Sequence, residues 1–139
     1  MISPKIILVA NTDWYLYNFR LALARFLRSQ GFEIVLISPP GRYAPLLTQA
    51  GFRWIEWNVG RQTLAPWTEL AALLRLRRLY RQEKPALVHQ HTIKPVLYGS
   101  LAARLARVPV IVTIFSLNLS DHRLYRECVT SEIVQCSWA

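Results

Sequence analysis

The stretch Lys5-Ile-Ile-Leu-Val-Ala10 is an unbroken apolar run, and it ends at the polar triplet Asn11-Thr-Asp13. A strand that is buried on both faces of a sheet has this composition, whereas a strand with one face in water alternates apolar and polar residues. Apolar residues at helical spacing follow from Tyr15 to Leu27, and Gly31 is well placed to end that helix. A buried strand followed by an amphipathic helix indicates the first unit of a parallel α/β sheet.

The same alternation continues along the chain. Further strands are expected at residues 33–38, 52–57, 86–89 and 109–113, separated by helices at residues 43–50, 66–83 and 95–106. Strands that alternate with helices in this way require right-handed crossovers. The expected fold class is therefore α/β, a doubly wound parallel sheet of Rossmann-like type. Ligands of such sheets bind beyond the carboxyl ends of the strands, so the loops at those ends are the candidate functional segments.

Composition limits the class of protein. The 139 residues suffice for one domain with a core, and 53% of them are hydrophobic. Cys128 and Cys136 do not have a metal-binding spacing, so we expect ordinary thiols in a cytoplasmic protein. No apolar stretch approaches the ~18 uninterrupted residues that a membrane-spanning helix needs.

The net charge of +9 favours anionic partners. One expected helix is strongly basic, with Arg75, Arg77, Arg78, Arg81 and the following Lys84. Aromatic residues are dense from Trp14 to Phe19, and aromatic and basic side chains together suit the headgroup layer of an acidic membrane. A solvated charged face is the alternative. Nucleic acid is disfavoured because no stacking platform or recognition helix accompanies the charge.

The first loop, from Ala10 to Tyr15, contains no glycine. A pyrophosphate could not approach such a backbone closely, and the chain has no Gly-Lys-Ser/Thr motif of the P-loop type. NAD and P-loop ATP binding are therefore disfavoured, and no cofactor is expected.

The fourth loop reads His89-Gln-His91-Thr92 and lies directly before Lys94-Pro95 and a helix. A histidine can accept a proton, donate one or hold a hydroxyl group in place. If the preceding strand runs far enough, its alternation places His89 and His91 on the same side. The alternative is that one of them caps the next helix or satisfies buried backbone groups. A metal site is disfavoured because no carboxylate or third histidine supports the pair.

Two charged residues beside these loops each have a functional and a structural interpretation. Lys94, next to a helix N-terminus, could hold a phosphate or carboxylate, or its ammonium group could be solvated. Asp13 could be a general base or could cap the first helix, and capping is favoured because the helical pattern follows at once.

Two segments together resemble the bacterial glycosyltransferases of family 4. One is the opening, Lys5-Ile-Ile-Leu-Val-Ala-Asn-Thr-Asp-Trp-Tyr-Leu-Tyr-Asn-Phe-Arg20. The other is Leu87-Val-His-Gln-His-Thr-Ile-Lys-Pro-Val-Leu-Tyr-Gly-Ser-Leu-Ala-Ala-Arg104, followed by Val108-Pro109. The likeness runs from about Lys5 to Thr113. It implies the N-terminal, acceptor-side lobe of a GT-B fold, in which two Rossmann-like lobes enclose the reaction.

The resemblance also implies an activity. Such enzymes transfer a sugar, with retention, from a nucleotide diphosphate donor that the C-terminal lobe binds, and they need no metal. Many act on lipid-linked acceptors in polysaccharide synthesis at the inner face of the membrane. By this resemblance His91, and second His89, are the candidate catalytic residues, which hydrogen-bond to the sugar or phosphate. Asn11, Thr12 and Asp13 are expected to face the acceptor, and Lys94 is added as a substrate-binding candidate from its place at the helix start.

Residues 114–139 show no pattern of the family. We therefore expect an acceptor-side domain at residues 1–113 and a divergent tail at 114–139, as in a truncated or frameshifted product that is inactive alone. The alternative is a non-catalytic, membrane-associated subunit that pairs with a separately encoded donor-binding lobe.

Overall fold

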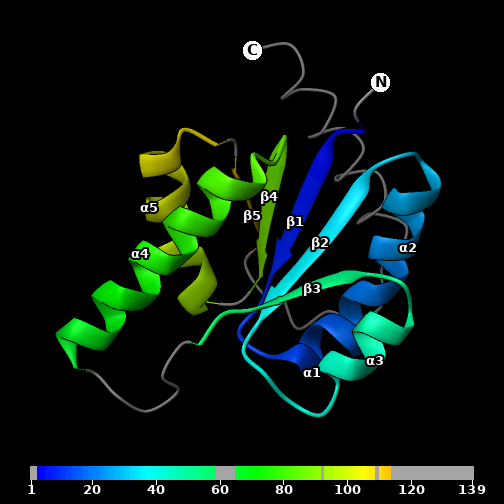
Figure 1. Ribbon diagram of the computed structural model, residues 1–139, viewed down its shortest axis with the longest axis horizontal. Helices are drawn as coiled ribbons and strands as arrows, with labels where there is room; N and C mark the ends of the chain where they lie inside the picture. Colours follow the sequence, from blue (N-terminus) through cyan, green and yellow to red (C-terminus); the bar gives the residue numbers. More distant parts are fainter. Residues whose placement is uncertain (1–2, 59–64, 92, 109, 114–139) are drawn as a thin grey trace.

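The computed structural model describes residues 3–58, 65–91, 93–108 and 110–113, with the backbone alone for residues 93, 94 and 110–113. These residues form one five-stranded sheet with helices on both faces (Figure 1). The strands are β1 (Lys5–Val9), β2 (Glu33–Ser38), β3 (Arg53–Glu56), β4 (Leu87–His91) and β5 (Val110–Thr113). All are parallel, in the order β3-β2-β1-β4-β5.

Helices connect successive strands. They are α1 (Asp13–Tyr15), the π-helix η1 (Leu16–Arg20), α2 (Leu21–Ser29), α3 (Ala44–Gln49), α4 (Pro66–Glu83) and α5 (Ile93–Ala106). Among the described residues, none of the helices combines the length and the apolar character that crossing a membrane requires.

Each face of the sheet packs against its own helices because successive residues of β1 point to opposite sides. Ile6 and Leu8 belong to a core that residues of α1, η1, α2 and α3 cover. Ile7 and Val9 belong to a second core, which is closed by α4 and α5. Figure 1 shows α4 and α5 together on one side of the sheet and α2 and α3 on the other. The predicted doubly wound parallel sheet is confirmed.

The elements follow the order that the sequence predicts, and α4 has the predicted bounds. Gly31 and Gly51 follow α2 and α3 with φ of +91° and +87°, a left-handed conformation that favours glycine at a helix end. Two differences affect the site. β4 runs past its expected end at His89 because β5 continues the ladder and pairs with His91. The first helix is interrupted by the π-helix η1, which ends at Arg20.

Candidate functional site

The candidate site lies at the carboxyl ends of β1 and β4, which are neighbours in the sheet although far apart in sequence. Val9 of β1 pairs with Gln90 of β4, so the loop after β1 and the end of β4 leave the sheet together. This is the edge at which ligands of doubly wound sheets bind. The arrangement brings the first and fourth loops, which were singled out from the sequence, to one place.

His89 and His91 face the same side of the sheet, as the alternation predicts once β4 reaches His91. Their ring centroids are 4.0 Å apart, and the two residues are 2% and 0% exposed. His89 pairs in register with Leu8, which belongs to the core under α1, η1 and α2. The intervening Gln90 points to the opposite side, where its amide accepts a hydrogen bond from Ser100 of α5. The two imidazole rings therefore form a buried pair on the α1–α2 side.

Arg20 completes this cluster, and no pattern in the sequence indicated a role for it. The Arg20 Nε donates a hydrogen bond of 3.1 Å to His91 Nδ1, across 71 residues of sequence. Its Nη2 donates to the Tyr15 hydroxyl at 2.6 Å, and the guanidinium carbon lies 5.1 Å from the centroid of the Tyr15 ring. The Tyr15 and His91 rings are also neighbours, 5.8 Å apart. Tyr15, Arg20, His89 and His91 are called the histidine cluster below.

The histidine cluster holds its imidazoles neutral. Burial, with a smaller contribution from the positive charge of Arg20, lowers the pKa of His89 to about 3. Burial also lowers the pKa of His91, with contributions from His89 and Arg20. A neutral imidazole has one donor nitrogen and one acceptor nitrogen. At neutral pH the cluster can therefore donate or accept hydrogen bonds, but it does not supply an imidazolium acid.

The first loop is fixed by its own hydrogen bonds. Tyr15 N donates to Thr12 Oγ1 at 3.0 Å, so Thr12 rather than Asp13 caps the first helix. The Asp13 carboxylate instead accepts hydrogen bonds from Tyr43 N at 2.7 Å and Ala44 N at 3.0 Å, at the start of α3. The same carboxylate also accepts a hydrogen bond of 2.9 Å from Trp14 N.

The substrate-binding candidates differ in their exposure and in whether their side chains are described. Asn11 and Thr12 are partly exposed at the carboxyl end of β1, whereas Asp13 is 5% exposed. Lys94 lies in the first turn of α5, and its side chain is outside the described part of the structure. Among the side chains that are described, no group of three or more His, Cys, Asp or Glu residues is placed to hold a metal ion.

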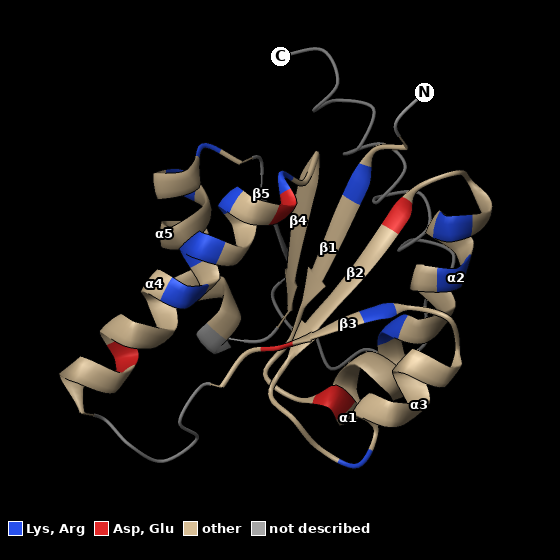
Figure 2. Cartoon of the chain, in the orientation of Figure 1, with Lys and Arg blue, Asp and Glu red and all other residues tan. Residues whose placement is uncertain are grey.

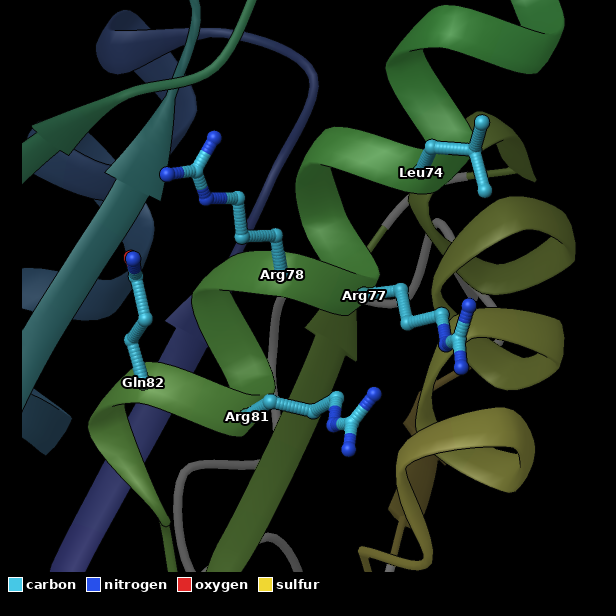
Figure 3. A pocket seen from close by; sticks show the side chains of 5 residues that line it. All are labelled: Leu74, Arg77, Arg78, Arg81 and Gln82. Atoms are coloured by element: carbon cyan, nitrogen blue, oxygen red, sulfur yellow. The ribbon is translucent and has the colours of Figure 1, made fainter.

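A second surface lies away from this edge, on the sides of α4 and α5 that face away from the sheet. Its apolar members are exposed: Trp67, Leu70 and Leu74 on α4, and Leu97, Leu101 and Leu105 on α5. Basic residues continue it along α4 (Figure 2). A shallow hollow here is lined by Leu74, Arg77, Arg78, Arg81 and Gln82. Figure 3 shows Arg77 and Arg81 extending toward α5, while Arg78 extends away from α5. This surface is called the outer α4–α5 face below.

Residues 5–131 match the family described as Glycosyl transferase 4-like. The match extends past Thr113, where the resemblance was expected to end, and the division of the chain at residue 113 stays a prediction. The match includes both the first loop and the histidine cluster.

Two curated relatives are similar to most of this chain. The UDP-N-acetylglucosamine--N-acetylmuramyl-(pentapeptide) pyrophosphoryl-undecaprenol N-acetylglucosamine transferase of Alcanivorax borkumensis is 32% identical over 121 residues, covering 81% of this chain and 34% of that protein. The N,N'-diacetylbacillosaminyl-diphospho-undecaprenol alpha-1,3-N-acetylgalactosaminyltransferase of Campylobacter jejuni is 24% identical over 94 residues, covering 68% and 25%. The chain thus spans about a third or less of these relatives.

Solved structures agree on the fold. The crystal structure of Acinetobacter baumannii MurG superposes with a TM-score of 0.65 and 24% identity, over 78% of this chain and 34% of that one. A glycosyltransferase from Rickettsia africae superposes with a TM-score of 0.68 and 17% identity, over 90% and 34%. Identities this low support the fold alone.

Proposed function

Because this chain belongs to the glycosyl transferase 4-like family, we propose that it forms the acceptor-side lobe of a retaining, nucleotide-sugar-dependent glycosyltransferase. The proposed acceptor is a lipid-linked diphosphate of cell-surface polysaccharide synthesis. Both relatives are named as transferases with an undecaprenol-linked pyrophosphate or diphosphate acceptor. The proposed donor is a nucleotide diphosphate sugar that a second lobe binds, with no cofactor and no metal in this lobe.

The observation that carries the proposal is the histidine cluster beside a glycine-free first loop. His91 is 0% exposed and its buried Nε2 has no hydrogen-bond partner among the described residues, whereas the loop after β1 lacks the glycines that a bound dinucleotide needs. Such an edge suits hydrogen bonding to hydroxyl or phosphate oxygens of an acceptor. Catalysis by preorganised polar groups needs both lobes around the leaving diphosphate. We therefore expect no measurable sugar transfer by the isolated 139-residue chain.

Binding experiments on the purified chain test this function. A short-chain polyprenyl diphosphate carrying N-acetylglucosamine should bind, and UDP-N-acetylglucosamine should bind far more weakly. His91→Gln should weaken binding of the polyprenyl diphosphate about tenfold, as expected for one lost hydrogen bond to a charged oxygen. Glu33→Gln, an exposed change at the amino end of β2, is the control and should bind as the wild type does. Preferential binding of the nucleotide sugar would contradict the proposal.

A second proposal concerns the outer α4–α5 face, which we infer docks on an acidic membrane surface. Leu97, Leu101 and Leu105 form one stripe along α5, and they are 62%, 49% and 49% exposed. The two helices pack on the same face of the sheet, so their outward sides point in the same direction. An apolar stripe beside arginines matches the headgroup boundary of anionic lipids, where each basic residue adds ~1 kcal/mol. A separate donor-binding lobe is the competing occupant of this face.

Vesicle sedimentation distinguishes the two occupants. The chain should bind vesicles that contain phosphatidylglycerol and not vesicles of phosphatidylcholine alone. Arg78→Gln combined with Arg81→Gln should reduce partitioning about 10- to 30-fold. The pair Arg25→Gln and Arg42→Gln removes the same charge from exposed positions outside this face and should have a much smaller effect. Equal losses from both pairs, or no binding to anionic vesicles, would contradict a lipid-docking face.

A further inference from the structure

The hydrogen bond between Arg20 and His91 determines where the imidazole proton of His91 resides. An arginine side chain has N–H donors and no acceptor. The nitrogen that receives the Arg20 Nε–H at 3.1 Å, His91 Nδ1, must therefore carry a lone pair and no proton. Rotating the ring by half a turn would place a carbon against Arg20 and lose the bond. The geometry thus excludes a proton on Nδ1.

The second imidazole nitrogen must then carry the proton. The ring is 0% exposed, and its surroundings include the cation Arg20 and a second imidazole, so it remains neutral. A neutral ring has one N–H, which leaves Nε2 as the only place for it. His91 Nε2 is buried and has no hydrogen-bond partner among the described residues. A buried donor without an acceptor is costly and is rarely left so in a folded protein.

We propose that Arg20 is a positioning residue that holds His91 as an Nε2–H donor, and that this N–H binds an oxygen atom of the acceptor. This inference rests on the proposed function, and it deepens it by naming the direction of the hydrogen bond. It assigns no general-base role to His91, because Nε2 already bears a proton and Nδ1 is occupied by Arg20. The oxygen belongs to a diphosphate or to a sugar hydroxyl of the acceptor.

Local structure explains how Arg20 reaches a ring on a distant strand. Arg20 is the last residue of the π-helix η1, and π-helical turns occur frequently at functional sites. Its Nη2 is anchored by the Tyr15 hydroxyl at 2.6 Å, so the guanidinium plane is held from one side while Nε points to His91. Tyr15 is therefore a second positioning residue, which acts on His91 through Arg20.

Nuclear magnetic resonance measures the tautomer directly. Long-range ¹H–¹⁵N spectra of the ligand-free chain at pH 7 should show His91 with an unprotonated Nδ1 and a protonated Nε2. In Arg20→Met the Nδ1 is released, and the Nδ1–H form should become readily detectable. Arg20→Lys retains a cationic donor and should restore the wild-type pattern in large part. Tyr15→Phe keeps Arg20 but removes the hydroxyl that anchors it, so its fraction of the Nδ1–H form should lie between those of the wild type and Arg20→Met. This variant takes the place of Arg20→Met if Arg20→Met does not fold.

Ligand binding tests the second half of the inference. The His91 Nε2 resonance should shift when the polyprenyl diphosphate sugar binds, and Arg20→Met should bind it about tenfold more weakly than the wild type. Inorganic pyrophosphate and free N-acetylglucosamine, added separately, identify whether the diphosphate or the sugar supplies the oxygen. A signal from either one supports the assignment.

The outcomes separate this inference from the proposed function. A wild-type His91 that is protonated on Nδ1, or an unchanged tautomer in Arg20→Met, overturns the role of Arg20 even if the acceptor binds. A correct tautomer whose Nε2 resonance is unmoved by every probe overturns the donor role. Binding of the acceptor in that last case would still support the proposed function.

Discussion

Asp13 joins the first loop to α3 through its carboxylate, which accepts hydrogen bonds from Tyr43 N and Ala44 N at 2.7 and 3.0 Å. Asp13→Asn replaces one acceptor oxygen by a donor, so at least one of the three N–H groups that donate to this carboxylate loses its acceptor. The free energy of unfolding should fall by about 1–3 kcal/mol, measured by urea denaturation. Gly41→Ala tests the same contact independently, because a Cβ at Gly41 would collide with the Asp13 carboxylate. It should also destabilise, and two neutral variants would contradict a structural role for Asp13.

The histidine cluster makes stability depend on pH. In the unfolded chain both imidazoles have an ordinary pKa near 6.5, whereas burial lowers the pKa of His89 to about 3 in the folded state and also lowers that of His91. Between these values the unfolded chain binds more protons than the folded chain. Stability is therefore full above about pH 6.5 and falls as the pH decreases, by up to ~1.4 kcal/mol per pH unit for each histidine.

Urea unfolding at pH 7.5, 6.0 and 5.0 measures that slope. His89→Gln removes one of the two titrating groups, so its slope over the same range should be about half that of the wild type. An equal slope in wild type and variant would show that His89 is not buried as a neutral ring.

At the scale of elements, the sequence predicts α4 well because Pro66 begins it and an apolar stripe defines its inner side. β4 is predicted too short for a physical reason. A run of His89, Gln90 and His91 does not resemble a buried strand, since buried polar groups need partners that only the folded chain supplies. The partners of His91 and Gln90 come from η1, α4 and α5. The role of Arg20 was not predicted because its hydrogen bond to His91 spans 71 residues of sequence and its π-helix has no sequence signature.

Gly99 lets α5 approach β4 closely. A Cβ at this position would collide with the Gln90 amide, which is 0% exposed and accepts a hydrogen bond of 3.1 Å from Ser100. Glycine to alanine within a helix is ordinarily stabilising by up to ~1 kcal/mol. Gly99→Ala should instead destabilise by about 1–3 kcal/mol because of overpacking. Thermal or urea unfolding of Gly99→Ala therefore decides the question by whether the free energy of unfolding rises or falls.

A paired variant separates overpacking from other causes. Gln90→Ser removes the amide that the new methyl group would meet, so Gly99→Ala should cost less in the Gln90→Ser background than in the wild type. Strict additivity of the two changes would contradict the collision.

At the scale of the whole molecule, the strand order separates two surfaces. The carboxyl edge brings the first loop and the histidine cluster together through the pairing of β1 with β4. The outer α4–α5 face lies on the helices that cover one face of the sheet. The alternation of strands and helices is readable from the sequence, whereas this juxtaposition depends on which strands become neighbours. The sequence therefore predicts the loops of the site but not the contacts among their side chains.

The amino edge of the sheet is held by Glu83 at the end of α4. Its carboxylate lies 2.8 Å from Lys5 Nζ of β1 and 2.7 Å from Arg53 Nη2 of β3, and its side chain is only 8% exposed. The hydrogen bond with Glu83 is the main cause that raises the pKa of Lys5. One residue thus connects a helix to two strands that are not neighbours in the sheet. Removing the charge of a nearly buried carboxylate leaves both cations without their main partner.

Glu83→Gln should therefore lower the free energy of unfolding by about 1–3 kcal/mol. Glu33→Gln is the matched control, because Glu33 also contacts Lys5, at 3.5 Å, but is 48% exposed. That control should lose less than about 0.5 kcal/mol, as exposed ion pairs usually do. Urea unfolding at low and high salt distinguishes the two, since salt screens the exposed pair more strongly than the buried one. Equal losses in the two variants would mean that the sheet and α4 are held together by their apolar core, without a measurable contribution from Glu83.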